Sequence, residues 1–346
     1  MPIKKADYLK KVSVEIFIKM GVSKETANIV SENIIENCLF GHDSHGMVLI
    51  PRFVKDIEIG KINLDAKSEI KRKSTCAAYI DGQRGFGQVT MIDAITTATK
   101  IAKEAGISAV TVTNCNHVGI LWTFAKKAVD AGVICMIWCA SGPQGGHVAP
   151  FGGIKNAVGT DPIAVGIPAG QMSPLILDIA TSAVSGGKIA LYARQNKKIP
   201  LGWMLDQNGN PTDNPNEMVK NGKITGILLP MAGYKGFGLA MVVEVLGGIL
   251  TGYGPAYTPD YKEGNGVFII AIDIEKFLPL QDFLRDTDAL FKYIKSVPTN
   301  PEIEEILIPG EIEYRSKLER EKNGIPLTDK EWEEISNLAD KLGIRL

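Results

Sequence analysis

Apolar residues recur every three to four positions near both ends of the chain, and form short continuous runs in its middle. Near the start, the spacing of Val12 and Ile16 predicts a helix over 5–20. Gly21 ends this helix, and Ser23 can cap a second helix that continues to about Phe40. The N-terminal region is therefore expected to be a helical hairpin.

A third helix is expected after Ser44, because apolar residues from Met47 onward keep the helical period until Gly60. This would place His45 in the first turn of the helix. Free amide groups and the positive end of the helix dipole favour an anion there, so a substrate carboxylate could be received beside His45.

From about Ala77 the pattern changes to short apolar segments separated by glycines, which is typical of strands. The expected strands are Ala77–Ile80, Ile107–Thr113, Val133–Cys139, Ile163–Ile167, Leu175–Asp178 and Val267–Ile274. The expected helices in this region are Met91–Lys103, Leu121–Ala131 and the apolar run Lys235–Leu250, which should be buried against the sheet. Alternating strands and helices predict an α/β layer with at least partly parallel pairing.

The ends of the chain carry more charge than its middle, and a capping box at Thr328–Glu331 opens a last helix to about Leu342. With 346 residues, about two domains are expected. We therefore expect one helical domain made from residues 1–75 and 283–346, built around a central sheet domain of residues 76–282.

The composition excludes some partners. The net charge is −1 and charged residues make up 22%, so nothing favours binding to nucleic acid. No run of about 18 apolar residues indicates a membrane span, and no signal segment is recognisable. We expect a cytoplasmic protein that acts on a small molecule.

Two of the four histidines, His45 and His117, lie in glycine-flanked polar breaks at the ends of expected elements. Imidazole exchanges protons near neutral pH, since its unperturbed pKa is about 6.5. Catalytic residues often lie on such connections. The pattern favours an enzyme, although each histidine could instead cap a helix or satisfy a buried turn.

Several common sites are missing from the sequence. No strand is followed by G-x-G-x-x-G, so a Rossmann dinucleotide site is disfavoured, and the phosphate-binding G-x-x-x-x-G-K-[ST] is also absent. His42 and His45 are three residues apart but lack a third ligand nearby. No metal site is therefore expected.

A series of glycine-rich polar joints remains at the ends of the expected strands. They are Ser44–Gly46, Asn116–Gly119, Pro150–Gly153, Gly159–Pro162, Asp178–Ser182, Gly187–Lys188, Tyr234–Gly238 and Pro309–Glu311. In this order, the joints resemble the malate/L-lactate dehydrogenase family of NAD(P)-dependent 2-hydroxyacid oxidoreductases, over nearly the whole chain. The segment Gly41–Gly46 is most similar to the broad-specificity hydroxycarboxylate dehydrogenases.

The resemblance implies an α/β fold with a non-Rossmann mixed-sheet cofactor domain, a helical domain built from both chain ends, and an intertwined homodimer. It implies that His117 is the general acid and base and that His45 lies near the nicotinamide and the substrate. Asp178 would be a third catalytic residue, while Ser44, His45 and Arg52 would position the substrate. From the residues alone, Asp178 could orient an imidazole, accept a ribose hydroxyl or cap the following helix.

By the same resemblance, the cofactor is NAD or NADP, with NAD preferred. The residues expected to line it are His45, Gly119, Ile120, Leu121, Thr160, Leu177, Asp178, Ile179, Tyr234, Lys235, Asn265, Gly310 and Glu311. Lys188 and Lys235 each stand at the start of an expected helix, where a lysine can also be merely solvated.

One position departs from the family pattern. Many members have an arginine three residues after the glycine of the Ser-His-Gly motif, where it can grip a carboxylate with two hydrogen bonds. Leu49 occupies that position here, and Arg52 follows one helical turn later. The departure favours a broad range of monocarboxylic 2-oxo acids over malate or sulfolactate. Two alternatives stay open: a reductase of cyclic imino acids, and a dinucleotide-binding protein without catalysis.

Overall fold

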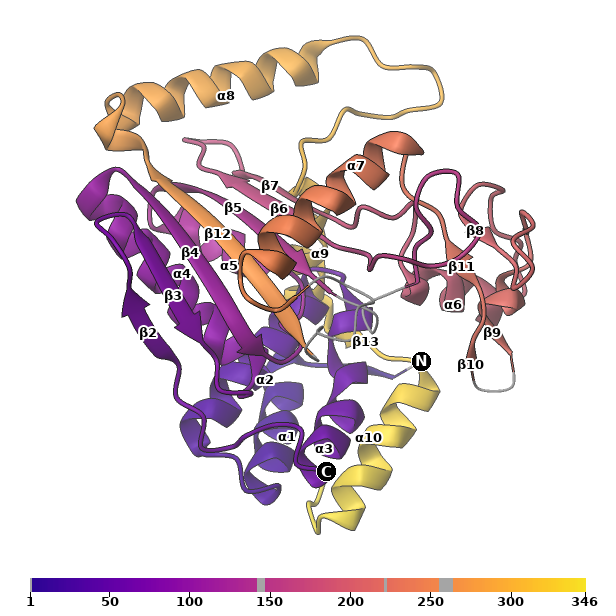
Figure 1. Ribbon diagram of the computed structural model, residues 1–346. Helices are drawn as coiled ribbons and strands as arrows, with labels where there is room; N and C mark the ends of the chain where they lie inside the picture. Colours follow the sequence, from indigo (N-terminus) through magenta and orange to yellow (C-terminus); the bar gives the residue numbers. More distant parts are fainter. Residues whose placement is uncertain (1, 142–146, 221–222, 255–263) are drawn as a thin grey trace.

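A seven-stranded mixed sheet forms the centre of the protein (Figure 1). The computed structural model describes residues 2–141, 147–220, 223–254 and 264–346. In spatial order the strands are β2 (Glu69–Arg72), β3 (Ala77–Asp81), β4 (Ile107–Cys115), β12 (Asn265–Asp273), β5 (Val133–Ala140), β6 (Ile163–Ile167) and β7 (Leu175–Ile179). The six strands expected from the sequence are all present.

Parallel pairing is confined to one pair of strands in this sheet. β3 and β4 are parallel, and the other neighbouring pairs are antiparallel. The late strand β12 inserts between β4 and β5, so those two strands run in the same direction without pairing. The expectation of partly parallel pairing is confirmed, but the sheet is mostly antiparallel.

Two helices cover one face of the sheet. α4 (Gly87–Ala105) and α5 (Trp122–Asp130) pack on alternate residues of the central strands, such as Ile137 of β5 and Ile269 of β12. This packing follows from the period of two along a strand, which sends every second side chain to the same face. It produces the largest apolar core of the protein.

The other face is covered by α7 (Tyr234–Val243) and the π-helical turn Glu244–Ile249 that continues it. Ala240 and Val243 are buried toward the sheet. The expectation that this whole run is buried is wrong, because its outer face is exposed. Large apolar side chains lie on that face: Leu239, Met241, Val242, Val245, Ile249 and Leu250.

Helices from both ends of the chain form a second layer of packing below the sheet (Figure 1). They are α1 (Ala6–Lys19), α2 (Lys24–Leu39), α3 (Ile50–Glu58), α9 (Glu311–Asn323) and α10 (Asp329–Lys341). β1 (Ile3–Lys4) pairs with β13 (Ile325–Pro326), which joins the two ends directly. The capping box of Thr328 and Glu331 is present at the start of α10. Helices from the two chain ends thus share one apolar cluster, as the expected fold class requires.

Two elements do not lie in the domain to which their residue numbers would assign them. β2 belongs to the sheet, although it precedes residue 76. α8 (Leu280–Ser296) runs along the far side of the sheet from the other terminal helices (Figure 1). There the Asp288 carboxylate accepts hydrogen bonds from the amides of Gly170, Gln171 and Met172. The division itself remains a proposal.

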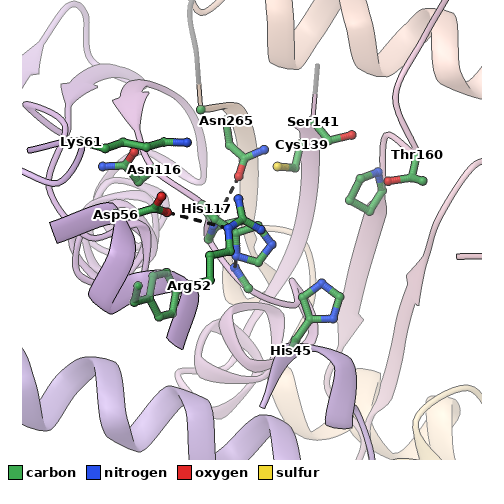
Figure 2. Close-up of a pocket in the computed structure, with 15 residues that line it drawn as sticks. His45, Arg52, Asp56, Lys61, Asn116, His117, Cys139, Ser141, Thr160 and Asn265 are labelled. Atoms are coloured by element: carbon green, nitrogen blue, oxygen red, sulfur yellow. Dashed lines mark hydrogen bonds and ion pairs between the residues drawn. The ribbon is translucent and has the colours of Figure 1, made fainter. Parts of the chain in front are cut away.

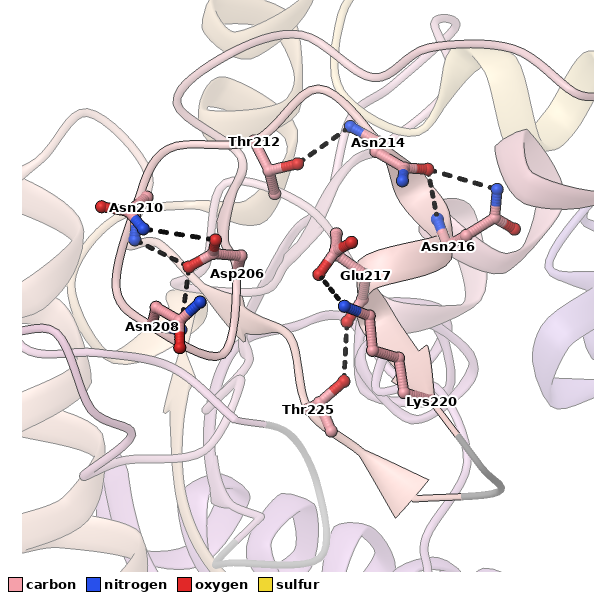
Figure 3. A network of polar contacts seen from close by, with 9 residues as sticks. All are labelled: Asp206, Asn208, Asn210, Thr212, Asn214, Asn216, Glu217, Lys220 and Thr225. Atoms are coloured by element: carbon pink, nitrogen blue, oxygen red, sulfur yellow. Dashed lines mark hydrogen bonds and ion pairs between the residues drawn. The ribbon is translucent and has the colours of Figure 1, made fainter.

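A small lobe follows β7 and packs around its own apolar cluster, which includes Val184, Ile189 and Met204. Its elements are α6 (Gly186–Arg194), β8 (Met204–Leu205), β9 (Val219–Lys220), β10 (Lys223–Ile224) and β11 (Ile227–Leu228). Figure 3 shows the polar contacts of the connection after β8, where Asp206 accepts hydrogen bonds from the backbone amides of Asn208 and Asn210. These bonds stabilise a surface turn.

Across the part of the chain that the structure describes, the helices are too short or too polar to cross a membrane.

Candidate active site

His45 lies in a 3₁₀ turn, Asp43–His45, and not in the first turn of a helix as expected. A second 3₁₀ turn, Met47–Leu49, intervenes before α3 begins at Ile50. Pro51 lies in the first turn of α3, where its missing N–H is tolerated. Because Gly46 and the second turn separate His45 from α3, the dipole of that helix does not account for an anion site beside His45.

The His45 turn rests on the end of α2. A Cβ added to Gly46 would lie 2.2 Å from the Cys38 sulfur, so the backbone must approach here without a side chain. Asn37 donates a hydrogen bond to the His45 carbonyl oxygen at 2.9 Å, and the Ser44 hydroxyl lies 3.1 Å from Nδ1 of the His45 ring. Burial, together with the nearby His42 and Arg52, lowers the pKa of His45 to about 4.

His117 follows β4 in a loop that packs against the start of α4. A Cβ added to Gly87 would lie 2.4 Å from the His117 carbonyl oxygen, so α4 can begin this close only with glycine there. The Gly119 amide donates to Nδ1 of the His117 ring at 3.3 Å, which leaves the proton of the neutral ring on Nε2. Burial lowers the pKa of His117 well below 6.5, and the positive groups of Arg52 and Lys61 lower it further.

The structure brings the two histidines together. Their ring centroids are 5.5 Å apart and their planes differ by 13°. The two residues are 72 positions apart in sequence (117 minus 45) and come from different layers of the fold. Their convergence within one chain creates a place where a proton could be transferred.

A cleft of about 200 Å³ lies beside these rings (Figure 2). Side chains from α3, from the loop after β4, and from the ends of β5, β6 and β12 point into it. Its lining residues are His45, Arg52, Phe53, Asp56, Lys61, Asn116, His117, Val118, Gly119, Cys139, Ser141, Thr160, Pro162, Gly264 and Asn265. Most of its polar groups are amides, hydroxyls and imidazoles, which suit an uncharged or anionic ligand.

Two cations line one side of the cleft. The Arg52 side chain is 45% exposed, and its Nε lies 3.7 Å from the Asp56 carboxylate, one helical turn along α3. Lys61 lies just after the end of α3 and also lines the cleft. Their positive charge would attract a carboxylate, as expected of Arg52 from the sequence.

Four of the residues expected to contact a cofactor line this cleft: His45, Gly119, Thr160 and Asn265. Asn265 is fixed from both sides, because its Oδ1 accepts from the Val118 amide at 3.3 Å and its Nδ2 donates to the Ala140 carbonyl at 3.2 Å. Ile120 and Leu121 are instead buried in the apolar core.

Asp178 lies outside the lining of the cleft, at the start of α5. Its carboxylate accepts a hydrogen bond from the Trp122 amide at 2.9 Å. It therefore caps a helix distant in sequence, and the expectation that it caps the helix that follows it is wrong, since Ser185 caps α6. Burial raises the pKa of Asp178 to about 6, against the opposing effect of the Trp122 amide.

Other expected cofactor residues gather near Asp178. Leu177 and Ile179 flank it on β7, and the Ile176 amide donates to the Pro309 carbonyl at 2.9 Å, which brings the Gly310–Glu311 turn beside the strand. Gly310 has a φ of 102° and packs on Ile176, where a side chain would be strained. The Glu311 carboxylate is bound by Lys295 at 2.6 Å.

Tyr234, Lys235 and Lys188 lie on α7 and the small lobe, and Ser44 lies in the His45 turn outside the lining of the cleft. Tyr234 begins α7, is 64% exposed and contacts the ring of Phe151 edge-on, with Lys235 next to it. Ser44 is exposed and packs against Gly187. Lys188 lies over the Trp203 ring at 5.5 Å, so this lysine has a protein partner.

Several cleft residues were not identified from the sequence. Asp56 on α3 and Cys139 on β5 belong to elements that were recognised by their apolar pattern alone, and Lys61 and Ser141 lie just beyond the ends of these elements. No motif marks these four residues. Asn116 stands inside the recognised joint before His117, and this position was the available signal. Among the described residues, no group of three or more His, Cys, Asp or Glu side chains could hold a metal ion.

Comparison with known proteins identifies the family. A sequence model of the malate/L-lactate dehydrogenase family matches residues 5–336. The chain belongs to this family. Relatives that match the chain include malate, sulfolactate and hydroxycarboxylate dehydrogenases, so the protein is a hydroxyacid dehydrogenase that uses a nicotinamide dinucleotide.

Individual relatives align with this dehydrogenase over nearly its whole length. It is 38% identical to a malate dehydrogenase of Pyrococcus horikoshii, over 98% of this chain and 95% of the relative. It is 30% identical to a Δ1-pyrroline-2-carboxylate reductase of Ancylobacter novellus, over 94% of each chain. A solved malate dehydrogenase of Entamoeba histolytica superposes with a TM-score of 0.93 at 27% identity, covering 100% of this chain and 99% of that one.

Proposed function

We propose that this dehydrogenase interconverts 2-oxo and 2-hydroxy carboxylic acids, with His117 transferring the proton and His45, Ser44 and Arg52 positioning the substrate. The observation that supports it is the pair of imidazoles 5.5 Å apart in a cleft that also contains a guanidinium group. An acid–base group and a carboxylate-binding group are what reduction of a 2-oxo acid requires besides the hydride donor.

The residues present fit a nicotinamide dinucleotide. When bound, this cofactor supplies the hydride or accepts it. The amide of Asn265, held from both sides, and the hydroxyl of Thr160 would hold its carboxamide end beside the histidines. We propose that the residues around Asp178 and Gly310, together with Tyr234 and Lys235, hold the remainder. The carboxylates of Asp178 and Glu313 in that region favour NAD over NADP, because they would repel a 2′-phosphate.

The lowered pKa of His117 determines how it works. Without substrate the ring is neutral at pH 7, with its proton on Nε2. A substrate carboxylate entering beside Arg52 adds negative charge to the cleft, and this raises the pKa of the ring. His117 can then take up a proton and donate it to the substrate oxygen, and in the reverse direction the neutral ring accepts it.

A single substitution tests the role of His117. His117→Asn should lower kcat about 10² to 10⁴-fold, because it removes the proton-transfer group, while the dissociation constant for NADH stays within about twofold. His147→Asn is the control, since His147 lies outside the cleft lining and hydrogen-bonds Asn156. Near-normal turnover of His117→Asn would refute its role.

A second candidate substrate class follows from Lys61. The sequence favoured monocarboxylic acids, but Lys61 joins Arg52 in the cleft lining. Two cations suit a substrate with a second acidic group, such as oxaloacetate. Initial rates with pyruvate, oxaloacetate and a cyclic imino acid, each with NADH and NADPH, separate the three substrate classes. If Lys61 binds a second carboxylate, Lys61→Met raises KM for oxaloacetate and leaves KM for pyruvate unchanged.

We further propose that the protein is a cytoplasmic homodimer. Four of the five cysteines are buried as free thiols, which fits a reducing compartment. The exposed apolar face of α7 and its π-helical extension would lie in the dimer interface. Light scattering after gel filtration should give twice the chain mass of 37.4 kDa, and Val242→Glu should reduce it toward the monomer mass.

A further inference from the structure

The turn that carries His45 has little apolar packing of its own. Asp43 and Ser44 are exposed, and His45 is only partly buried, with its ring facing the cleft. Such a turn on the surface would move freely unless polar contacts held it. The position of His45 opposite His117 therefore requires an anchor outside the turn.

One face of α9 provides such contacts. Glu313, Ser316 and Arg320 are spaced three and four residues apart, so they point the same way from the helix. Glu313 lies 3.6 Å from the ring of His42, and the Ser316 hydroxyl donates to the Leu39 carbonyl at 3.1 Å. This face of α9 thus contacts consecutive parts of the chain, from the end of α2 to the start of the His45 turn.

Arg320 makes the strongest of these contacts. Its guanidinium binds both carboxylate oxygens of Asp43, with Nη2 to Oδ2 at 3.1 Å, and also donates to the Cys38 carbonyl. The Arg320 side chain is only 16% exposed. A two-pronged bond between charged groups fixes orientation as well as distance.

The same guanidinium completes the end of α2. The last carbonyls of a helix have no partner within the helix, and the last turn of α2 contains no basic residue. Arg320 supplies positive charge to the negative end of this helix dipole from a segment 282 residues later (320 minus 38). Arg320 therefore joins α9, α2 and the His45 turn.

We propose that Arg320 is a positioning residue that acts through Asp43 to hold the His45 imidazole opposite His117. The proposal rests on the role of His45 given under the proposed function. α9 begins at the Gly310–Glu311 turn beside β7 and is about 20 Å long at 1.5 Å per residue. One rigid helix thus connects the proposed dinucleotide region to the proton-transfer site.

The experiment compares Arg320→Met in two backgrounds. In the otherwise unchanged enzyme, kcat/KM should fall about 10- to 100-fold, because a displacement of about 1 Å at a reacting group has that effect. In a His45→Asn background, the same substitution should change kcat/KM less than about twofold, since no imidazole remains to be misplaced. Arg315→Met is the matched control, because Arg315 lies on the same helix and pairs with Glu305 at the surface.

A second variant and a second measurement distinguish a misplaced His45 from a protein that has merely lost its fold. Asp43→Asn keeps the shape of an exposed side chain and should give a smaller loss of kcat/KM, and combining it with Arg320→Met should add nothing to the loss from Arg320→Met alone. In the protein without substrate, NMR titration of the four histidines should show the His45 pKa rising from about 4 toward 6.5 in Arg320→Met, because a loosened turn admits water.

The outcomes separate this proposal from the proposed function. Unchanged activity of His45→Asn would refute the role of His45. A large loss in His45→Asn, combined with an equal loss from Arg320→Met in both backgrounds, would instead refute the positioning role of Arg320. An unchanged kcat/KM in Arg320→Met would refute it as well.

Discussion

The low pKa of His45 predicts how the stability of the fold depends on pH. A histidine whose pKa is lower in the folded than in the unfolded chain destabilises the fold as pH falls, because the unfolded chain binds the proton more readily. For His45 the two values are about 4 and 6.5. Its contribution should therefore be small at neutral pH and grow through this interval.

The magnitude follows from the two pKa values. The difference between the two pKa values corresponds to about 3 kcal/mol of unfolding free energy when fully expressed, and about 2 kcal/mol of it should be lost between pH 7 and pH 5. Asp178, with its raised pKa, contributes with the opposite sign over the same interval. The absolute stability curve therefore mixes several groups, but the difference between wild type and His45→Asn isolates His45.

Urea unfolding followed by circular dichroism, at fixed protein concentration and ionic strength, measures this difference. We expect the free energy of unfolding of His45→Asn to gain about 2 kcal/mol relative to wild type between pH 7 and pH 5. His147→Asn serves for comparison and should gain less, because burial lowers the pKa of His147 by a smaller amount. Parallel curves for wild type and His45→Asn would show that the ring is not desolvated in the folded protein.

Two further substitutions test other buried carboxyl groups. Burial alone would raise the pKa of Asp288, but the hydrogen bonds from three backbone amides outweigh burial and lower the pKa below its usual value. Asp288→Asn should therefore lower the free energy of unfolding by about 1.5–3 kcal/mol at pH 7. The deficit should shrink in acid, and a constant deficit would contradict the assignment. Burial raises the pKa of Asp161 above 3.8, so the free energy of unfolding of wild type should fall relative to that of Asp161→Asn as the pH rises above 3.8. A difference between the two proteins that does not change with pH in urea unfolding would contradict this prediction.

Local sequence patterns predicted most of the elements but not how they are arranged. The strand over Val267–Ile274 was recognised from its apolar run, yet nothing local shows that it inserts between β4 and β5, since that position depends on partners more than 120 residues earlier. β2 was missed because its four residues are exposed at the sheet edge and lack an apolar face. The 3₁₀ turn of His45 was mistaken for a helix, because apolar spacing does not distinguish the 3₁₀ turns Asp43–His45 and Met47–Leu49 from the start of α3.

The candidate site shows the same limit. His45 and His117 were identifiable because glycines flank them, whereas Lys61 and Ser141 reach the cleft only through the packing of α3 and the end of β5. The contact between Asp178 and the start of α5 links residues 56 positions apart (178 minus 122). Spacing along the chain cannot reveal such a contact, because it depends on how β7 is placed against α5.

The pairing of β1 with β13 bears on how the protein is made. On the ribosome, the first helices emerge some 320 residues before Ile325 and Pro326, the strand that completes their layer. At a rate of synthesis of roughly 5–20 residues per second, the apolar faces of these helices stay without that partner for tens of seconds. Linking α10 to β1 and opening the chain at a surface turn, such as the one after β8, would let both halves of the helical layer emerge as one continuous segment.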